Sequence, residues 1–312
     1  MSTRAAAISF FVALLLGSAM AWAGSQGSAA TDLGALAGSP FEDLLTSLLG
    51  GFGYGPGIPV FALLVVVAFL VQWLAFVPAF LLQTEKFYDL TGSLTYLTVT
   101  VLALVLGPVP DARALLLGMM VGIWATRLGT FLFRRALREG GDSRFDDIKP
   151  SFVRFLNTWT LQGLWVTITA SAALAAITSL HRPELGFWAA IGVPIWGFGF
   201  LFEVVADHQK AQFRADPANE GEFIRTGLWS LSRHPNYFGE IVLWVGVALT
   251  AFPALQGWQH ATLVSPLFVY LLLSRVSGIP MLEKKADERW GGREEYERYK
   301  AETPVLMPRW FG

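Results

Sequence analysis

The sequence predicts an all-α protein, a polytopic membrane bundle of about seven transmembrane helices that follow an N-terminal signal-like segment. Hydrophobic residues make up 54% of the 312 positions and charged residues only 15%, where a soluble domain carries about 25%. The charge is missing from long blocks instead of being thinned evenly. The basic residues gather in alternate connections between these blocks. Lipid is therefore the expected solvent for much of the chain.

The N-terminal segment has two interpretations. Arg4 precedes an apolar run that ends at Met20, and Ala21-Trp22-Ala23 follows, which is typical of a secretory signal with an A-x-A cleavage site. Residues 1–23 are therefore either a signal peptide or an uncleaved first helix. Residues 24–57 are rich in Gly, Ser and Ala and are predicted to form a flexible extracytoplasmic arm. Residues 58–312 then form the membrane domain.

Seven uncharged runs supply the predicted spans. They cover residues 58–83, 91–110, 114–126, 155–180, 185–202, 241–259 and 261–274. A helix needs about 20 residues to cross a bilayer, so the third run must continue through Arg127 to Phe133. The last run is short, and with Pro266 and Pro280 it is expected to be broken or tilted.

Charged connections give the orientation. The connection 134–154 and the tail after residue 280 are rich in Lys and Arg, whereas the connection 252–260 has neither. Basic loops face the cytoplasm in membrane proteins. The C-terminal tail is therefore predicted to be cytoplasmic.

Composition also excludes several classes of function. The absence of cysteine rules out disulfides, thiolate zinc sites and a cysteine nucleophile. The four histidines, His181, His208, His234 and His260, form no i, i+4 pair, so no metal site is expected. A net charge of −1 gives no support for nucleic-acid binding.

The first group of candidate site residues lies at the end of the third span. Arg127, Phe131, Arg134 or Arg135, and Arg138 follow helical spacing and present a cationic ladder on one helix face. Ionisable side chains at membrane depth are costly and are functional candidates by default. The alternative is that these arginines extend to the membrane interface, an explanation that suits Arg127 least because it lies deepest.

The second group comprises Glu203, Asp207 and Lys210, which share a helix face at i, i+4 and i+7. Two carboxylates at the end of a membrane helix are suited to accept hydrogen bonds from ribose hydroxyls or to orient an arginine. The alternative is a solvated Asp207–Lys210 pair worth about 0.3 kcal/mol.

The third group, in residues 227–240, is the most specific signal. Pro235 suits the first turn of a helix, and Arg233 and His234 precede it. A helix N-terminus has free N–H groups, so with adjacent cations it is suited to bind a phosphate or pyrophosphate.

Deeper in the same predicted helix, Asn236 and Glu240 are four residues apart and share a face. Tyr237 and Trp244 offer flat surfaces for a ring. The alternative is an ordinary helix start with Glu240 paired to an arginine elsewhere.

Four blocks together carry a family resemblance. They are Glu203 to Lys210, Gly227 to Glu240, Ser277 to Glu283, and Tyr296-x-x-Tyr-Lys with the terminal Pro-x-Leu-x-Pro. In this combination the chain resembles bacterial membrane proteins of the DUF1295 group, which is similar to the steroid 5-alpha-reductase and sterol-reductase superfamily. The resemblance covers roughly residues 87–311 and is strongest after Phe202.

The resemblance implies a multi-pass reductase of the bacterial inner membrane. NADPH would enter from the cytoplasm and bind the C-terminal helices, while the N-terminal helices would hold an enone-bearing, lipid-like substrate. The family's Asn-x-x-Gly-Glu segment matches Asn236 to Glu240, and its preceding acidic residue matches Asp207. Steroid reductases also polarise the substrate carbonyl with an early Glu and Tyr pair, for which Glu85, Tyr88 and Asp89 are candidates by position.

The predicted NADPH site combines these groups. Its phosphates are expected near the cations, and its ribose and nicotinamide against the polar residues below them. The predicted cofactor-binding residues are Arg127, Arg144, Asp207, Lys210, Arg233, His234, Asn236, Tyr237, Glu240 and Glu283. The expected partners are the lipid-like substrate and the bilayer.

A second family offers an alternative function. Arg233 to Gly239 also resembles the Arg-His-Pro-x-Tyr-x-Gly motif of isoprenylcysteine and phospholipid methyltransferases, which bind S-adenosylmethionine. Those enzymes continue with paired glutamates, whereas this chain has Glu283-Lys284 there and places Glu240 directly after Gly239. Both departures favour the reductase, and the arginines suit three phosphates better than a sulfonium.

Overall fold

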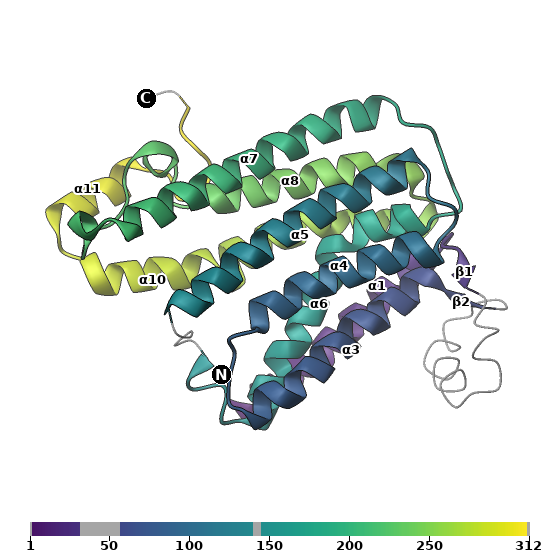
Figure 1. Cartoon of the computed structure of the whole chain (residues 1–312), viewed down its shortest axis with the longest axis horizontal. Coiled ribbons are helices and arrows are strands. Elements are labelled where there is room, and N and C mark those ends of the chain that lie inside the picture. The colour runs from purple at the N-terminus through teal and green to yellow at the C-terminus, as the bar shows by residue number, and fades with distance from the viewer. Residues whose placement is uncertain (1, 32–56, 140–144, 311–312) are drawn as a thin grey trace. The chain divides into compact units, whose positions relative to one another are not determined.

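The computed structural model describes residues 2–31, 57–139 and 145–310. It confirms the all-α prediction (Figure 1). The long helices of the N-terminal part are α1 (Thr3–Ser25), α3 (Val60–Leu81), α4 (Tyr88–Leu106), α5 (Ala112–Glu139) and α6 (Phe152–Thr178). The later α-helices are α7 (Phe187–Ala215), α8 (Pro235–Ala251), α9 (Ser265–Leu271), α10 (Ile279–Trp290) and α11 (Glu294–Glu302).

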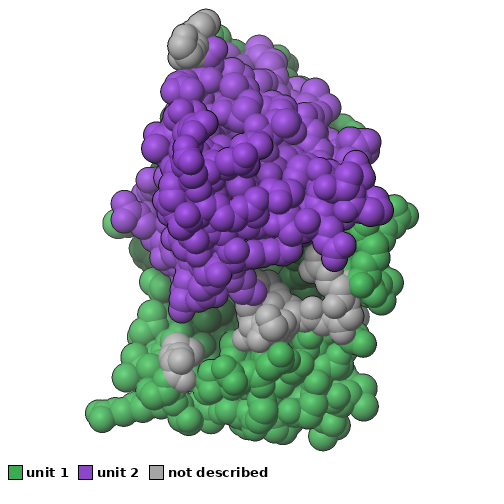
Figure 2. Space-filling model, turned by 90° about the vertical axis from the view of Figure 1, so that its left-hand side faces the viewer, with its two compact units in different colours: residues 1–188, 250–265 green, residues 189–249, 266–312 purple. Residues whose placement is uncertain are grey.

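Eight helical segments of the described chain are long and apolar enough to span a membrane. One lies near the N-terminus and seven follow it, as the apolar runs predicted. The chain splits into two compact units, coloured separately in Figure 2. Unit 1 comprises Met1–Trp188 with Thr250–Ser265, and unit 2 comprises Ala189–Leu249 with Pro266–Gly312.

Helix α1 packs inside unit 1 against α3 and α6. Gly17 of α1 faces the ring of Phe69, and Gly24 faces the ring of Phe61 so closely that neither has room for a Cβ. The carbonyl of Gly24 accepts a hydrogen bond from Gln259 Nε2 at 3.2 Å. The small residues of the signal-like segment thus form a packing surface.

A short strand within the predicted extracytoplasmic arm pairs with the residues that follow the arm. Strand β1 (Ala30–Thr31) pairs antiparallel with β2 (Ile58–Pro59), and the amide of Ala29 donates to the carbonyl of Thr178 at 2.8 Å. Residues 32–56 of the arm lie outside the described part of the chain.

Unit 2 is built on close contact between α7 and α8. A Cβ placed on Gly199 of α7 would lie 2.5 Å from the backbone nitrogen of Leu243, and one on Gly239 of α8 would lie 2.6 Å from that of Glu203. Glycine lets two membrane helices bring their backbones together in this way. Helix α7 also continues past the predicted apolar run to Ala215, so its polar residues stand on a rigid helix.

The last candidate span is interrupted, as its prolines predicted. Helix α9 passes into a π-helical turn at Leu272–Val276, and α10 starts afresh at Ile279 with Pro280 in its first turn. Proline lacks the amide that a continuous helix would need at that position. The break separates the charged helix α10 from the apolar helix α9.

Candidate functional site

A polar cluster lies where α7 ends and α8 begins. Helix α8 starts at Pro235, as predicted. Asn236 in its first turn donates from Nδ2 to Asp207 Oδ1 of α7 at 3.1 Å. Asp207 is 6% exposed. The glycine contact between the helices brings these two polar side chains within hydrogen-bond distance and orients the buried carboxylate.

Glu283 of α10 joins the two residues that precede α8. Its Oε2 lies 2.7 Å from Arg233 Nη1, and its Oε1 lies 2.7 Å from His234 Nε2. Both hydrogen bonds are charge-assisted, and such bonds are stronger than those between neutral groups. The cationic helix start predicted from sequence therefore already binds one carboxylate of the same chain, and a phosphate arriving there would share Arg233 with Glu283.

His234 is held neutral by its surroundings. Burial lowers the pKa of its imidazole below the ordinary value, and the positive charges of Lys210 and Arg233 lower it further, against the opposing effect of Glu283. The ring stacks on Tyr237, with centroids 5.7 Å apart and planes 11° from parallel. A buried neutral histidine is a hydrogen-bonding group and not a cation.

The C-terminal tail fixes the segment that carries Arg233. The amide of Arg233 donates to Pro304 O at 2.9 Å, and the amide of Arg309 donates to Leu231 O at 3.0 Å. The hydroxyl of Ser232 donates to Leu306 O at 2.9 Å. These hydrogen bonds to the C-terminal tail hold the segment with Arg233 and His234 in place.

Other predicted residues of unit 2 occupy the same helices. Glu203 is buried at 2% exposure, while Glu240 is half-buried. Lys210 places its Nζ 4.2 Å from the centre of the Trp229 ring, and the indole nitrogen of Trp229 donates to Ala206 O at 3.0 Å. The cation–π contact keeps the Lys210 charge near the cluster.

The predicted arginines of unit 1 stand on or after α5. Arg127 is half-buried and lies over the ring of Phe131, 5.3 Å from its centre, which agrees with the predicted helical spacing. Arg135 lies 3.9 Å from Asp89, so the two form an ion pair. Arg144 lies outside the described residues. A role for Arg127 and Arg144 in cofactor binding stays a prediction.

The catalytic candidates of unit 1 each have structural partners. Glu85 is 7% exposed and forms an ion pair with Lys149 at 2.7 Å. This hydrogen bond is the main reason that the pKa of Lys149 is raised. The ion pair favours the ionised carboxylate, which carries no proton to donate, so Glu85 is a poorer candidate acid than its position in the sequence indicated.

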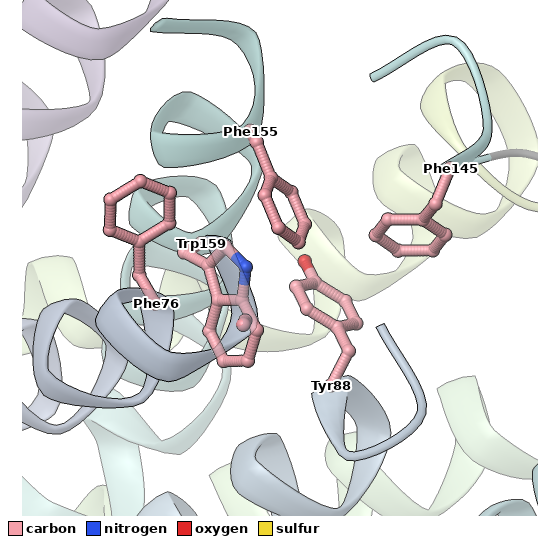
Figure 3. Close-up of a cluster of buried hydrophobic side chains, with 6 residues drawn as sticks. Phe76, Tyr88, Phe145, Phe155 and Trp159 are labelled. Carbon is pink, nitrogen blue, oxygen red and sulfur yellow. The ribbon is translucent and has the colours of Figure 1, made fainter. Parts of the chain in front are cut away.

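Tyr88 stands in an aromatic cluster. Its ring lies among those of Phe145, Phe155 and Trp159 (Figure 3), and its hydroxyl donates to Thr158 O at 3.0 Å. The single hydroxyl proton of Tyr88 is thus donated to a backbone carbonyl, and Tyr88 would have to exchange that partner in order to polarise a substrate carbonyl. A catalytic role for Tyr88 stays a prediction.

One buried polar residue was missed by the sequence analysis. Asn157 of α6 is 1% exposed, and neither atom of its side-chain amide has a hydrogen-bond partner among the described residues. Such a group is unusual in a folded protein. It stands within an uncharged run, and a search based on charge passes over an amide.

Comparison with known proteins places the chain in a family. Residues 75–303 match the family described as "Protein of unknown function (DUF1295)". The chain belongs to the DUF1295 family. No solved structure matches it.

Three curated proteins show more distant similarity to this DUF1295 protein. The bovine 3-oxo-5-alpha-steroid 4-dehydrogenase 1 is 34% identical over 117 residues, which are 38% of this chain and 40% of the relative. An uncharacterised protein of Schizosaccharomyces pombe is 23% identical over 168 residues, 45% and 49% of the two chains. A probable O-methyltransferase of Ustilaginoidea virens is 31% identical over 98 residues, 31% and 33%. The matched region thus spans less than half of each relative.

Proposed function

We propose that this DUF1295 protein is a membrane-embedded, NADPH-dependent reductase of a conjugated double bond in a steroid-like or other lipid. The observation that carries the proposal is the polar cluster of unit 2. Asp207 and Asn236 form one hydrogen-bonded pair in it, and Glu283 binds Arg233 and His234 in a second group. The similarity to a steroid dehydrogenase supports the same class of reaction.

The residues of the cluster fit a nucleotide cofactor. Arg233 Nε and His234 Nδ1 are buried and have no hydrogen-bond partner among the described residues, and buried polar atoms left without partners destabilise a protein. Arg233 and Lys210 would bind phosphate, and the Asp207 carboxylate, oriented by Asn236, would accept from a ribose hydroxyl. Tyr237 and Glu240 would line the deeper part of the site. NADPH supplies a hydride when bound.

We further propose that unit 1 holds the lipid-like substrate. An enone is reduced more readily when a proton donor polarises its carbonyl oxygen. Tyr88 is the proposed donor: its ring is packed in place, and its hydroxyl would exchange the Thr158 carbonyl for the substrate oxygen. Glu85 and Asp89 then position neighbouring groups through Lys149 and Arg135.

An S-adenosylmethionine-dependent methyltransferase of the isoprenylcysteine or phospholipid type is the alternative function. It is favoured by the similarity to a probable O-methyltransferase and by the Arg-His-Pro-x-Tyr-x-Gly motif. S-adenosylmethionine brings a carboxylate and no phosphate, and an arginine can bind either anion. Titration with each cofactor side by side therefore separates the two functions.

The test is an NADPH titration of the purified protein and of Arg233→Ala. A lost charge-assisted hydrogen bond to phosphate corresponds to about 1.5–3 kcal/mol, or an affinity roughly 10- to 150-fold weaker. Arg298→Ala is the matched control, because Arg298 is exposed and, within the described part of the chain, forms its ion pair along its own helix with Glu294. Equal NADPH affinity in the two variants would count against the proposed phosphate contact.

A further inference from the structure

We infer that His234 serves the bound nucleotide as a neutral hydrogen-bond acceptor, presenting Nδ1 to an O–H or N–H donor of the ligand, while Glu283 fixes its tautomer. The inference rests on the proposed function. It changes the role expected of His234 from sequence, where it counted as a cation for phosphate.

The tautomer follows from the contact with Glu283. The carboxylate of Glu283 already binds the Arg233 guanidinium through Oε2, and an ionised carboxylate can only accept hydrogen bonds. The proton of the 2.7 Å contact between His234 Nε2 and Glu283 Oε1 therefore belongs to Nε2. In a neutral ring the other nitrogen, Nδ1, then carries a lone pair.

That lone pair has no donor among the residues that the structure describes. The His234 side chain is only 6% exposed, and Nδ1 makes no hydrogen bond to the described residues. A buried acceptor left without a donor destabilises a protein. Because the ring stacks on Tyr237, it lies over the first turn of α8, beside the helix start where a ligand would meet free backbone amides.

The charged groups around the ring keep it neutral. Glu283 of α10 faces Nε2 and favours the charged form, whereas Arg233 beside it and Lys210 of α7 oppose that form, as does burial. If the ring were protonated, Nδ1–H would become a buried donor without a partner. The geometry and the surrounding charges therefore both favour an Nδ1 atom that accepts a hydrogen bond.

The chemistry of the ligand group follows. Ionised phosphate oxygens only accept hydrogen bonds, so they cannot pair with an Nδ1 lone pair. The partner must be a donor, which on NADPH means a ribose hydroxyl or an amide N–H. Phosphate binding is left to Arg233 and Lys210. S-adenosylmethionine also carries ribose hydroxyls, so both cofactors enter the test.

Two isosteric variants separate the two ring nitrogens. His234→Asn keeps a polar acceptor near the position of Nδ1 and loses the contact with Glu283, whereas His234→Gln keeps a donor for Glu283 and loses Nδ1. Titration with NADPH is expected to show about 10-fold weaker binding for His234→Gln, the value of one hydrogen bond, and a smaller loss, within about 3-fold, for His234→Asn. The reverse order would overturn the inference, because His234 would then act through Glu283 alone. Unchanged binding in both variants would overturn it too.

The wild-type protein supplies a measurement that needs no variant. With only four histidines in the chain, ¹⁵N-labelled imidazole spectra can resolve His234. Nδ1 is expected in its unprotonated range at neutral pH and should shift when NADPH is added. A protonated Nδ1, or an Nδ1 signal that does not shift when NADPH binds, would overturn this inference and leave the proposed reductase function standing.

The cofactor arms distinguish the two proposals. Binding of S-adenosylmethionine but not NADPH, with the same order of variants, overturns the reductase and supports the acceptor role of His234. A protein that binds neither nucleotide overturns both.

Discussion

At the scale of single residues, the Glu283 carboxylate binds Arg233 and His234 at once, and the side chains involved are between 6% and 24% exposed. Removing one partner of a buried ion pair leaves an uncompensated charge and costs about 3–5 kcal/mol. Partial exposure reduces that figure, so Glu283→Gln is expected to destabilise the protein by about 1–3 kcal/mol.

The measurement is thermal unfolding in detergent, with Glu294→Gln as the control. Glu294 forms an ion pair of similar length with Arg298, but its side chain is 86% exposed, so its loss should be close to neutral. If the two variants unfold at the same temperature, the Glu283 contacts contribute nothing to stability.

His234 should make stability depend on pH in the acidic range. Burial lowers the pKa of His234 in the folded protein, so the unfolded chain binds more protons once the pH drops below about 6.5, the ordinary value. The stabilising effect is complete above that pH and is lost as the pH falls toward the folded value. The unfolding temperature of the wild type should thus fall more steeply than that of His234→Gln between pH 7 and pH 5, while His208→Gln, at an exposed position, should follow the wild type.

The residue types of the cluster could be predicted from the sequence, but their pairing could not. Arg233, His234, Asn236 and Asp207 stood out because cations and polar groups at membrane depth are rare. Glu283 is 50 positions from Arg233, and no periodicity relates them. Only the folded chain shows that Glu283 binds Arg233 and His234, which the sequence had predicted to bind phosphate.

At the scale of elements, the contact between α7 and α8 depends on glycines without room for a side chain. Gly199→Ala would place a methyl group 2.5 Å from the backbone of α8, whereas nothing lies within 4 Å of a Cβ on Gly197 in the same helix. Alanine is favoured over glycine in a helix by about 1 kcal/mol. Gly197→Ala should therefore be neutral or stabilising, while Gly199→Ala should destabilise by about 1–3 kcal/mol.

Chemical or thermal unfolding of the two variants checks this prediction. The second readout is NADPH affinity, since separating α7 from α8 should also disturb the hydrogen bond between Asn236 and Asp207. A Gly199→Ala protein as stable as Gly197→Ala would show that the helices do not need this close approach.

Helix α1 gives the third structural prediction. Its glycines fit against Phe61 and Phe69, and Ala21 and Ala23 are buried at 4% and 6% exposure. Cleavage after Ala23 would expose the apolar faces of α3 and α6 that α1 covers. We therefore predict that residues 3–25 stay in the mature protein. The intact mass of protein purified from membranes checks this prediction, and a mass lacking the first 23 residues would contradict it.

Apolar runs predicted most spans because bilayer thickness sets helix length. In α7 the uncharged run ends at Phe202 although the helix continues to Ala215, and the i, i+4, i+7 spacing of Glu203, Asp207 and Lys210 predicts only part of that continuation. Charge ends a run without ending a helix, and helix ends depend on capping and tertiary packing instead. Pro266 and Pro280 predicted the break between α9 and α10 correctly, because proline changes the helix backbone directly.

At the scale of the whole molecule, the basic connections predict that the C-terminal tail faces the cytoplasm. The chain has no cysteine, so single cysteines can report the topology directly. Arg298→Cys in the tail should react with a membrane-impermeant maleimide only in inverted vesicles, and His181→Cys only in intact cells. Labelling of both positions from the same side would contradict the predicted orientation.

The most direct test of the reductase proposal is a side-by-side binding titration of the purified wild-type protein with NADPH, NADH and S-adenosylmethionine. Binding of NADPH, with little or no binding of S-adenosylmethionine, is the predicted result. Binding of S-adenosylmethionine without NADPH would contradict the reductase and establish the methyltransferase alternative in its place.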